Sequence, residues 1–352
     1  MVFRILFFII FPFYEGKTRL FQFFPNLLAG FIILLSAFVL QAAEITPFYT
    51  QNRSPLVQIS GLPPIGNSSL LTPGRGDFRL TVDLANNFVD DHTSDESIIL
   101  DGEETRISLD ARYGISRNFE IGIVIPYVIQ SGGFLDGFID GVHDTFGASG
   151  GGRDQAPKNR LLYRYVKDGQ ERLNLHTSSA GLGDISLSAA WQVYGGPNQT
   201  ASIALRSSLE LPTGDTSQLH GGGSMDLSLW LVGGRNFSGA YGLLNLFGAA
   251  GLLGMTDGNV LEGQQENLVA FGSLGIGWSP TRWIALKIQA NANTPFYHDS
   301  ELISLSQNSV QLTVGGTLAF SQNTTLDVGF TQDIIKRTSP DALFHLSLRH
   351  QF

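Results

Sequence analysis

Apolar and polar side chains alternate along much of the chain, most regularly over residues 344–352. Successive side chains of a β-strand point to opposite faces of a sheet, so a period of two predicts a strand with one apolar and one polar face. Eleven earlier segments repeat the alternation over about 9–11 residues, the length of a transmembrane β-strand. The predicted strands are residues 77–88, 104–115, 119–127, 184–193, 200–211, 224–232, 241–252, 268–278, 284–293, 310–320, 325–332 and 344–352.

The connections between these strands alternate in length. Bacterial barrels have short periplasmic turns and long external loops, whereas a soluble β-sandwich has no reason to sort its loops in this way. The sequence therefore predicts an all-β fold: a transmembrane antiparallel up-and-down β-barrel of about twelve strands over residues 77–352. It is expected in the outer membrane of a Gram-negative bacterium, with both termini in the periplasm. The long connections are residues 89–103, 130–180, 212–223, 253–267, 294–309 and 333–343, and the short ones are 116–118, 194–199, 233–240, 279–282 and 321–323.

The apolar phase of the strands is predicted to face lipid. Its aromatic rings gather beside the short turns and at the opposite strand ends, as in the two interfacial belts of membrane barrels. The ending resembles the C-terminal insertion signal of bacterial outer-membrane proteins, although His350 occupies an outward position that is normally apolar or aromatic. This implies outer-membrane lipid, the barrel-insertion machinery and periplasmic chaperones as partners. The outward residues of the final strand are Phe344, Leu346, Leu348 and Phe352.

Two segments before the first strand fall outside the alternating pattern. Residues 1–43 contain an apolar run, 27–40, with basic residues before it and small residues after it, which is typical of a secretory signal removed near Ala43. The run is short for a transmembrane helix of about 20 residues, and an anchor of two short helices is the alternative. Residues 44–76 contain prolines, which disfavour a central strand. This periplasmic N-terminal segment is expected either to plug the lumen or to add an edge strand.

The polar phase of the strands is predicted to face the lumen, and its charges are of both signs. One interpretation is a polar pathway for a small solute; the other is a lumen filled by charge pairs, because buried charges need partners. A barrel of about twelve strands is narrower than porins of about 16–18 strands, so both interpretations stay open. The lumen-facing candidates are Arg79, Asp83, Arg106, Asp110, Arg112, Glu120, Asp184, Arg206, Glu210, Asp226, Lys287, Asp327 and Arg349, and Glu104 and His345 share their phase.

The longest connection, residues 130–180, is predicted to contain a short helix between the third and fourth strands. Its large apolar residues recur at steps of four, which is a helical stripe. A surface helix packed on the barrel rim is one interpretation, and a lid over the lumen is the other. The stripe consists of Phe134, Phe138, Val142 and Phe146.

Composition and motifs exclude several kinds of chemistry. The formal net charge of −9 disfavours nucleic-acid binding, and the absence of cysteine excludes disulfides and cysteine-ligated metals. No metal or other cofactor is predicted, because the acidic pairs in the loops lack the ligand density of a calcium site. Some barrels of this size are lipases, and His220 and Ser224 share a glycine-rich loop. They form no nucleophile motif, so the sequence predicts a protein that is not an enzyme.

The irregular segments carry a family resemblance. The chain resembles an uncharacterised proteobacterial family, domain-of-unknown-function family 3187, which implies an outer-membrane barrel similar to outer-membrane transport barrels. The predicted role is passive transport, a channel for a small solute; the alternatives are a closed structural or binding barrel that acts through its external loops, and an outer-membrane hydrolase. The resemblance is carried by residues 51–52, 55–59, 61–63, 138–147, 152–155, 157–160, 181–184 and 210–215.

Overall fold

The computed structural model describes residues 44–137, 157–197, 199–335 and 338–352. Residues 1–43, expected to be a signal segment, lie outside this range. Within it, no helix is long and apolar enough to cross a membrane. The elements are β1 (Gly76–His92), β2 (Glu96–Ser116), β3 (Phe119–Ser131), β4 (Leu162–Lys167), β5 (Gln170–Leu175), β6 (Ser179–Leu182), β7 (Ile185–Tyr194), β8 (Ala201–Leu211), the 3-10 helix η3 (Thr216–Gln218), β9 (Asp226–Gly239), β10 (Gly242–Met255), β11 (Leu268–Ser279), β12 (Ile284–Asn293), α4 (Ile303–Ser306), β13 (Ser309–Ala319), β14 (Thr324–Asp333) and β15 (Ala342–Gln351).

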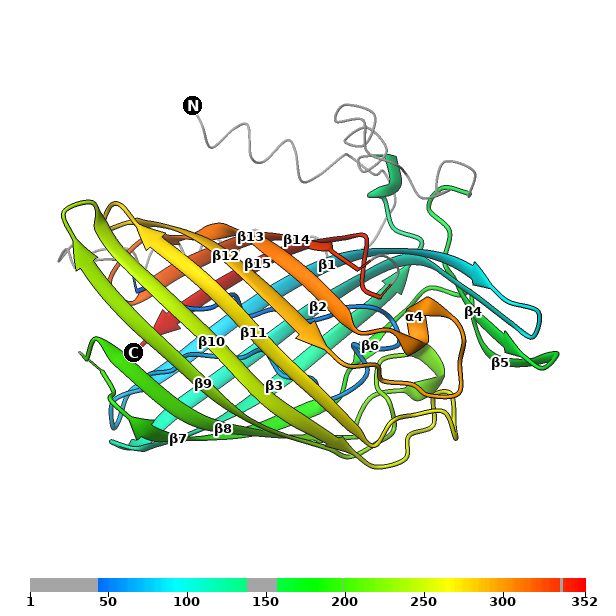
Figure 1. The fold of residues 1–352 in the computed structure, drawn as a ribbon, viewed down its shortest axis with the longest axis horizontal. Helices are drawn as coiled ribbons and strands as arrows, with labels where there is room; N and C mark the ends of the chain where they lie inside the picture. Colours follow the sequence, from blue (N-terminus) through cyan, green and yellow to red (C-terminus); the bar gives the residue numbers. More distant parts are fainter. Residues whose placement is uncertain (1–43, 138–156, 198, 336–337) are drawn as a thin grey trace, which may run out of the picture. The chain divides into compact units, whose positions relative to one another are not determined.

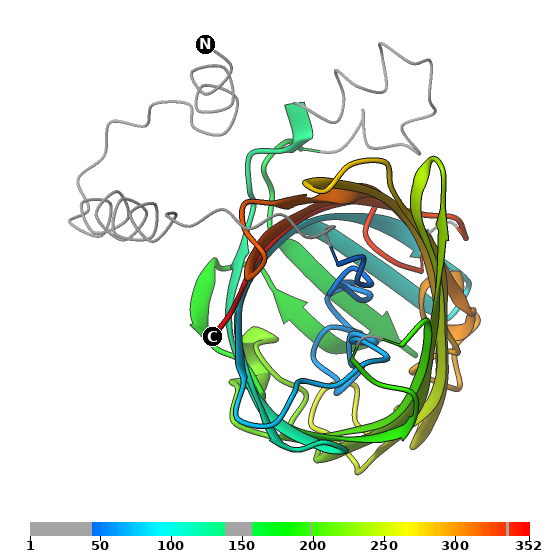
Figure 2. The ribbon, with the colours of Figure 1, turned by 90° about the vertical axis from the view of Figure 1, so that its left-hand side faces the viewer.

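Twelve of these strands close into a barrel, which confirms the predicted fold class (Figures 1 and 2). Each pairs antiparallel with its neighbours in the order β1, β2, β3 and β7 to β15. The last strand closes the ring, because β15 pairs with β1 over the register from Asp77↔Gln351 to Asn86↔Ala342. Closure leaves no unpaired strand edge in hydrocarbon, where an unpaired backbone group costs several kcal/mol.

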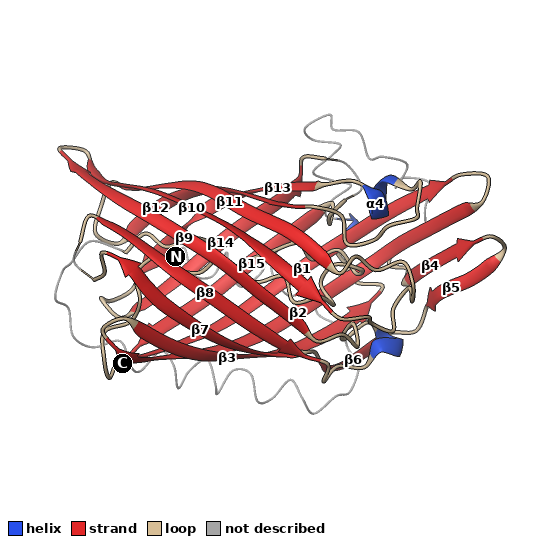
Figure 3. Ribbon diagram, turned by 60° about the horizontal axis from the view of Figure 1, so that its bottom comes forward, coloured by secondary structure: helices blue, strands red, loops and turns tan. Residues whose placement is uncertain are grey.

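The two ends of the barrel differ. We call the end with the β2–β3, β7–β8, β9–β10, β11–β12 and β13–β14 connections the turn end, and the opposite end the loop end. The chain finishes at the turn end, where Gly76 and Phe352 exchange backbone hydrogen bonds of 2.9 and 3.0 Å. The hairpin of β4 and β5 projects beyond the barrel at the loop end, close to the outer part of β2 (Figure 3).

Three predicted connections contain strand structure instead. Most of residues 89–103 belongs to extended β1 and β2, most of residues 233–240 belongs to β9, and residues 130–180 contain β4, β5 and β6. For residues 233–240 the reason is that β9 stays paired with β10 up to Gly239↔Gly242. For the other two connections it is pairing beyond the membrane segment: β4 lies against the outer part of β2, with Ile98 opposite Tyr165 and Leu100 opposite Tyr163. The strand β4 is short, and its apolar residues belong to a buried core only because β4 pairs with β2.

The predicted loop helix is only partly within the described residues. Asp136 and Gly137 are helical, and the Phe134 side chain just before them is 59% exposed. Phe138, Val142 and Phe146 lie outside the described residues. The helix α4 instead occurs in the connection between β12 and β13.

The outer wall is apolar and carries aromatic rings at the turn end. Tyr113, Trp191 and Trp278 are exposed there, as expected for rings at a membrane–water interface. Leu346 and Phe352 of the final segment are also exposed. The outward position of His350, which departs from an apolar insertion signal, is explained by a polar neighbour: its Nδ1 lies 2.9 Å from Thr324 Oγ1 on β14. The two residues are register partners on adjacent strands.

Candidate functional site in the barrel lumen

The barrel lumen contains the chain's own N-terminal residues. Residues 44–76, which we call the inner segment, run inside the barrel and hydrogen-bond to inward side chains of its wall (Figure 2). The predicted lumen-facing residues are therefore buried rather than lining an open pore. All thirteen are between 1% and 7% exposed: Arg79, Asp83, Arg106, Asp110, Arg112, Glu120, Asp184, Arg206, Glu210, Asp226, Lys287, Asp327 and Arg349.

The first part of the inner segment is held by β12. The Lys287 Nζ donates to the Thr46 carbonyl oxygen at 3.0 Å and lies 4.0 Å from the centroid of the Phe48 ring. The Phe48 backbone N–H donates to Gln289 Oε1 at 2.8 Å. Lys287 also forms an ion pair of 3.0 Å with Asp327 on β14. One lysine therefore connects the wall to the inner segment, and its charge is balanced within the wall.

A second anchor is the arginine of the inner segment. Arg53 Nη2 lies 2.8 Å from Asp83 Oδ2 on β1, and the other oxygen of that carboxylate is 2.7 Å from His345 Nδ1 on β15. Further along, Gln58 receives a hydrogen bond of 2.7 Å from Arg106 Nη1. The inner segment thus crosses the lumen from the turn end, and Arg53 and Gln58 both contact polar groups of the wall.

The inner segment then returns along β8 and β9. Asp226 accepts a 2.8 Å hydrogen bond from the Gly61 N–H, and Trp230 Nε1 donates to the Ile65 carbonyl oxygen at 2.8 Å. Glycine is required at position 61, because a Cβ there would lie 2.7 Å from the Asp226 Cβ. These contacts satisfy backbone groups that have no ladder partner.

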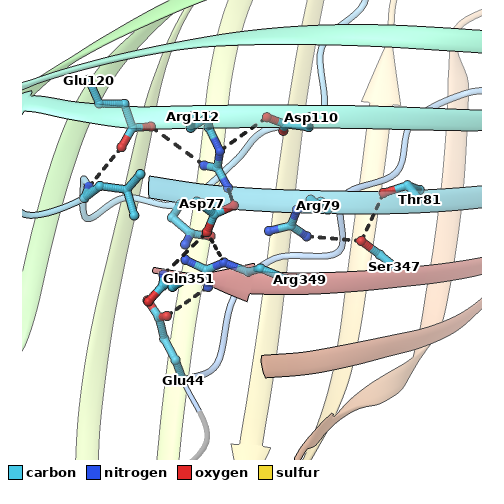
Figure 4. A network of polar contacts seen from close by, with 12 residues as sticks. Glu44, Asp77, Arg79, Thr81, Asp110, Arg112, Glu120, Ser347, Arg349 and Gln351 are labelled. Carbon is cyan, nitrogen blue, oxygen red and sulfur yellow. Dashed lines mark hydrogen bonds and ion pairs between the residues drawn. The ribbon is translucent and has the colours of Figure 1, made fainter. Parts of the chain in front are cut away.

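A network of charges lies at the turn end of the lumen (Figure 4). Asp77 on β1 accepts from Arg112 Nη2 on β2 at 3.0 Å and from Arg349 on β15. Arg112 also approaches Glu120 of β3 within 3.7 Å, and Arg349 pairs with Glu44 at 2.9 Å. The network joins four neighbouring strands, β15, β1, β2 and β3, to the start of the inner segment.

Two cavities between the inner segment and the wall bear on function. The larger, of about 580 Å³, is at the turn end, and its lining includes Glu44, Arg112 and Arg349. The smaller, of about 60 Å³, lies deeper and is lined by Arg53, Arg112 and Arg206, among others. Arg112 lines both cavities, so it stands at their boundary. Charge pairs and the inner segment fill the lumen around these two spaces.

Asp184 has a different environment from the other lumen candidates. It lies between β6 and β7 and not on a strand, and it accepts backbone hydrogen bonds from Thr213, Gly214 and Gly222 at 2.8, 2.7 and 3.0 Å. Three donors converging on one carboxylate hold the connection between β8 and β9 over the loop end. We therefore describe Asp184 as a loop anchor.

His220 and Ser224, the two residues considered for hydrolysis, do not form a nucleophile–base pair. The His220 Nε2 atom lies 3.1 Å from the Ser179 Oγ atom of β6, and burial lowers the pKa of His220. Within the described ranges, no three His, Asp or Glu residues are grouped so that they could hold a metal ion.

Sequence reasoning missed the polar residues that meet the inner segment's backbone. Trp230 shares the inward phase of Asp226 on β9, and Gln289 shares that of Lys287 on β12, so strand periodicity contained a signal for both. Arg53 had a weaker signal, because it lies in an irregular segment where no strand phase indicates its direction. Its partner Asp83 could not be inferred from the sequence.

The closed barrel, apolar outside and charged inside, defines the class of outer-membrane β-barrel proteins. The chain belongs to the family described as "Protein of unknown function (DUF3187)", whose sequence profile matches residues 23–352. This confirms the family resemblance found in the sequence. A comparison with curated proteins found no match.

A comparison with solved structures found an outer-membrane channel with the same fold and weaker likenesses to other barrels. The COG4313 outer membrane channel from Pseudomonas putida F1 is 12% identical with a TM-score of 0.52, and the match covers 81% of this chain and 98% of that one. The Pseudomonas putida toluene transporter TodX is 10% identical with a TM-score of 0.35, covering 87% and 94%. The translocator domain of the autotransporter NalP from Neisseria meningitidis is 10% identical with a TM-score of 0.39, covering 80% and 90%.

Proposed function

We propose that this protein is an outer-membrane channel for passive movement of a small solute, and that the inner segment is a plug that controls conduction. The observation that carries the proposal is the cavity of about 580 Å³ at the turn end, which shares the lining residue Arg112 with the deeper cavity. The COG4313 channel, which shares the fold, is consistent with this role. The turn end faces the periplasm in this proposal, because bacterial barrels have short periplasmic turns, and both termini then lie there.

The plug is held in the lumen by non-covalent contacts, which supports the proposal that it can move. The wall holds it through hydrogen bonds and ion pairs such as Arg53–Asp83 and Trp230–Ile65, and the chain has no cysteine that could link it covalently. A hydrogen bond contributes about 0.5–1.5 kcal/mol net, because water or a solute can replace the partner. A plug held in this way can leave part of the lumen without unfolding the barrel.

A second candidate is a closed barrel that acts through its external parts. The extension of β1 and β2 with the β4–β5 hairpin favours it, since this structured surface projects beyond the loop end. Such a barrel would stay closed whatever the position of the inner segment. Conduction measurements on plug variants therefore separate the two candidates.

The test is a reversible covalent lock. Ser68 Oγ of the plug lies 2.8 Å from Ser202 Oγ of β8, so Ser68→Cys with Ser202→Cys places two thiols at bonding distance in a chain that has no other cysteine. In planar bilayers and in liposome-swelling assays, we expect the oxidised variant to conduct at least about tenfold less than the reduced one, because a disulfide bond survives where hydrogen bonds exchange.

The matched control locks only the wall. Thr313 and Thr331 are register partners on β13 and β14, with their hydroxyl oxygens 2.8 Å apart, so a cysteine pair there leaves the plug free. Its conduction should be the same oxidised and reduced. If a variant that lacks residues 47–70 is silent in both assays while folded, the channel proposal is wrong and the closed barrel is favoured.

We also propose that β15 directs assembly. Phe344, Leu346, Leu348 and Phe352 would then be read by the barrel-insertion machinery, with periplasmic chaperones delivering the chain to the outer membrane. The pairing of β15 with both β14 and β1 supports this, because the last strand completes the ring.

A further inference from the structure

We propose that the deeper cavity is a binding site for an oxyanion, the carboxylate or phosphate group of a small solute. The inference rests on the proposed channel function where it names the solute class, but binding itself can be tested without transport. The cavity lies between the plug and β1, β2, β3, β7, β8 and β9, so groups of both the plug and the wall line it.

The charges that line this cavity are mainly positive. Four arginines and one carboxylate contribute to it: Arg53, Arg106, Arg112, Arg206 and Glu210. The ion-pair partners of three of these arginines lie outside the lining, Asp83 for Arg53 and Glu120 for Arg112 and Arg206, whereas Glu210 lies within it. Four guanidinium groups therefore meet in one space with a single carboxylate.

Two guanidinium nitrogens in this lining have unused hydrogen-bonding capacity. Among the described residues, neither Arg53 Nη1 nor Arg206 Nη2 has a hydrogen-bond partner. Both residues are buried, with 5% and 6% of their surface exposed. Leaving a buried donor unsatisfied costs about 1–3 kcal/mol, and more when it is charged. An acceptor that carries negative charge would satisfy both, and guanidinium groups match the geometry of carboxylate and phosphate.

The size and the neutral lining fit such a group. A volume of about 60 Å³ accommodates roughly four water molecules at about 10–15 Å³ each, which is the scale of a carboxylate or phosphate. Hydroxyl groups of Ser108, Ser188 and Ser208 also line the cavity and can donate to an anion. This cavity is therefore large enough for the headgroup of a small acid.

The site couples binding to the plug. Arg53 belongs to the plug and Arg206 to β8, so an anion that contacts both bridges them. A ligand that binds only the folded, plugged arrangement raises its stability by RT ln(1 + [L]/Kd). Anion binding is therefore measurable as a shift of the unfolding temperature.

The experiment measures that shift for the full mature chain, purified in a zwitterionic detergent. Succinate and inorganic phosphate are titrated separately, and chloride at matched ionic strength reports simple screening. We expect a saturable rise in Tm with at least one oxyanion. Arg206→Gln should weaken apparent affinity at least about tenfold, the loss of one charge-assisted contact.

A second variant keeps the test independent of folding defects. Arg53→Lys retains a cation for Asp83 but removes the free Nη1 donor, so it should fold and still weaken anion binding. Arg164→Gln is the matched control, because Arg164 is outside the cavity and half-exposed. Equal Tm shifts in all variants, equal shifts with chloride, or no shift at all would each overturn the site.

The outcome also separates this inference from the channel proposal. If the protein binds the oxyanion but does not conduct after plug removal, the binding site is supported and the channel proposal is wrong. If the protein conducts but shows no oxyanion-specific Tm shift, the channel proposal is supported and the binding site is wrong. The relative affinity for succinate and phosphate identifies which oxyanion chemistry the cavity prefers.

Discussion

Lys287 is the side chain whose removal most directly tests how the wall holds the inner segment. Its side chain is fully buried, and its Nζ lies 3.0 Å from both the Asp327 Oδ1 atom and the Thr46 carbonyl oxygen. Lys287→Met keeps the aliphatic length and removes the charge. Removing one partner of a buried ion pair costs about 3–5 kcal/mol, because it leaves the other charge buried without compensation. Asp327 keeps a hydrogen bond of 2.6 Å from Thr317 Oγ1, so we expect the lower part of that range, about 3 kcal/mol.

A double variant distinguishes the energy of the Lys287–Asp327 ion pair from that of the other contacts of Lys287. Lys287→Met with Asp327→Asn removes both charges, so no buried charge is left unpaired. The remaining cost should be about 1–2 kcal/mol, chiefly the hydrogen bond lost by the Thr46 carbonyl and the contact with the Phe48 ring. The double variant should therefore be about 1–2 kcal/mol more stable than Lys287→Met alone, and the Asp327→Asn single variant completes the cycle that gives the coupling energy.

The assay is denaturant unfolding of the purified protein in detergent, followed by tryptophan fluorescence. The control is Arg164→Met, which breaks the ion pair of 2.7 Å with Glu171, where the two side chains are 46% and 42% exposed. We expect it to cost less than about 1 kcal/mol, because solvent screens exposed pairs. If Lys287→Met cost no more than this control, the argument from burial would be refuted.

Three further substitutions test the inner segment, a loop and the final strand. Gly61→Val would push a side chain into Asp226, so limited proteolysis should release residues 44–76 faster while the barrel's β-structure signal stays unchanged; equal cleavage rates would contradict the close contact. Burial lowers the pKa of His220, so the unfolded form of the loop binds a proton at this residue more readily than the folded form. The loop should therefore lose hydrogen-exchange protection as the pH falls below about 6.5, and His220→Gln should remove that dependence. Protection that does not change with pH in the unaltered protein would contradict this prediction. Phe352→Ala should lower the yield of the folded, heat-modifiable barrel in cells, and an unchanged yield would show that the last residue is not read during assembly.

The alternating pattern was sufficient to predict the barrel, because every spanning strand faces lipid on one side and the polar lumen on the other. Residues such as Leu346 face lipid and their neighbours face the lumen, so the period of two survives over a whole strand. Outside the membrane that constraint ends. Tyr163 and Tyr165 are buried only because β4 pairs with Ile98 and Leu100, and the six-residue strand carries too short a pattern to be distinguished from a loop.

The candidate site was predictable as a set of residues but not as an arrangement. Strand phase alone places Arg112 and Arg349 on the inward face, yet their shared partner Asp77 depends on β15 pairing with β1. The contact of Arg53 with Asp83 depends on where an irregular segment runs. Ion pairs between distant segments follow from the register and from the path of the chain, which no local pattern encodes.

The sequence by itself determined a closed β-barrel with a lipid face and a charged lumen, because each backbone group in hydrocarbon must be paired and each outward side chain must be apolar. Only the tertiary structure decided what fills the lumen. Residues 44–76 have no ladder and no lipid face to impose a period, so their path follows from where buried charges and unpaired backbone groups satisfy each other. The wall supplies those partners from strands far apart in the chain, as Lys287 does for Thr46 and Asp226 does for Gly61.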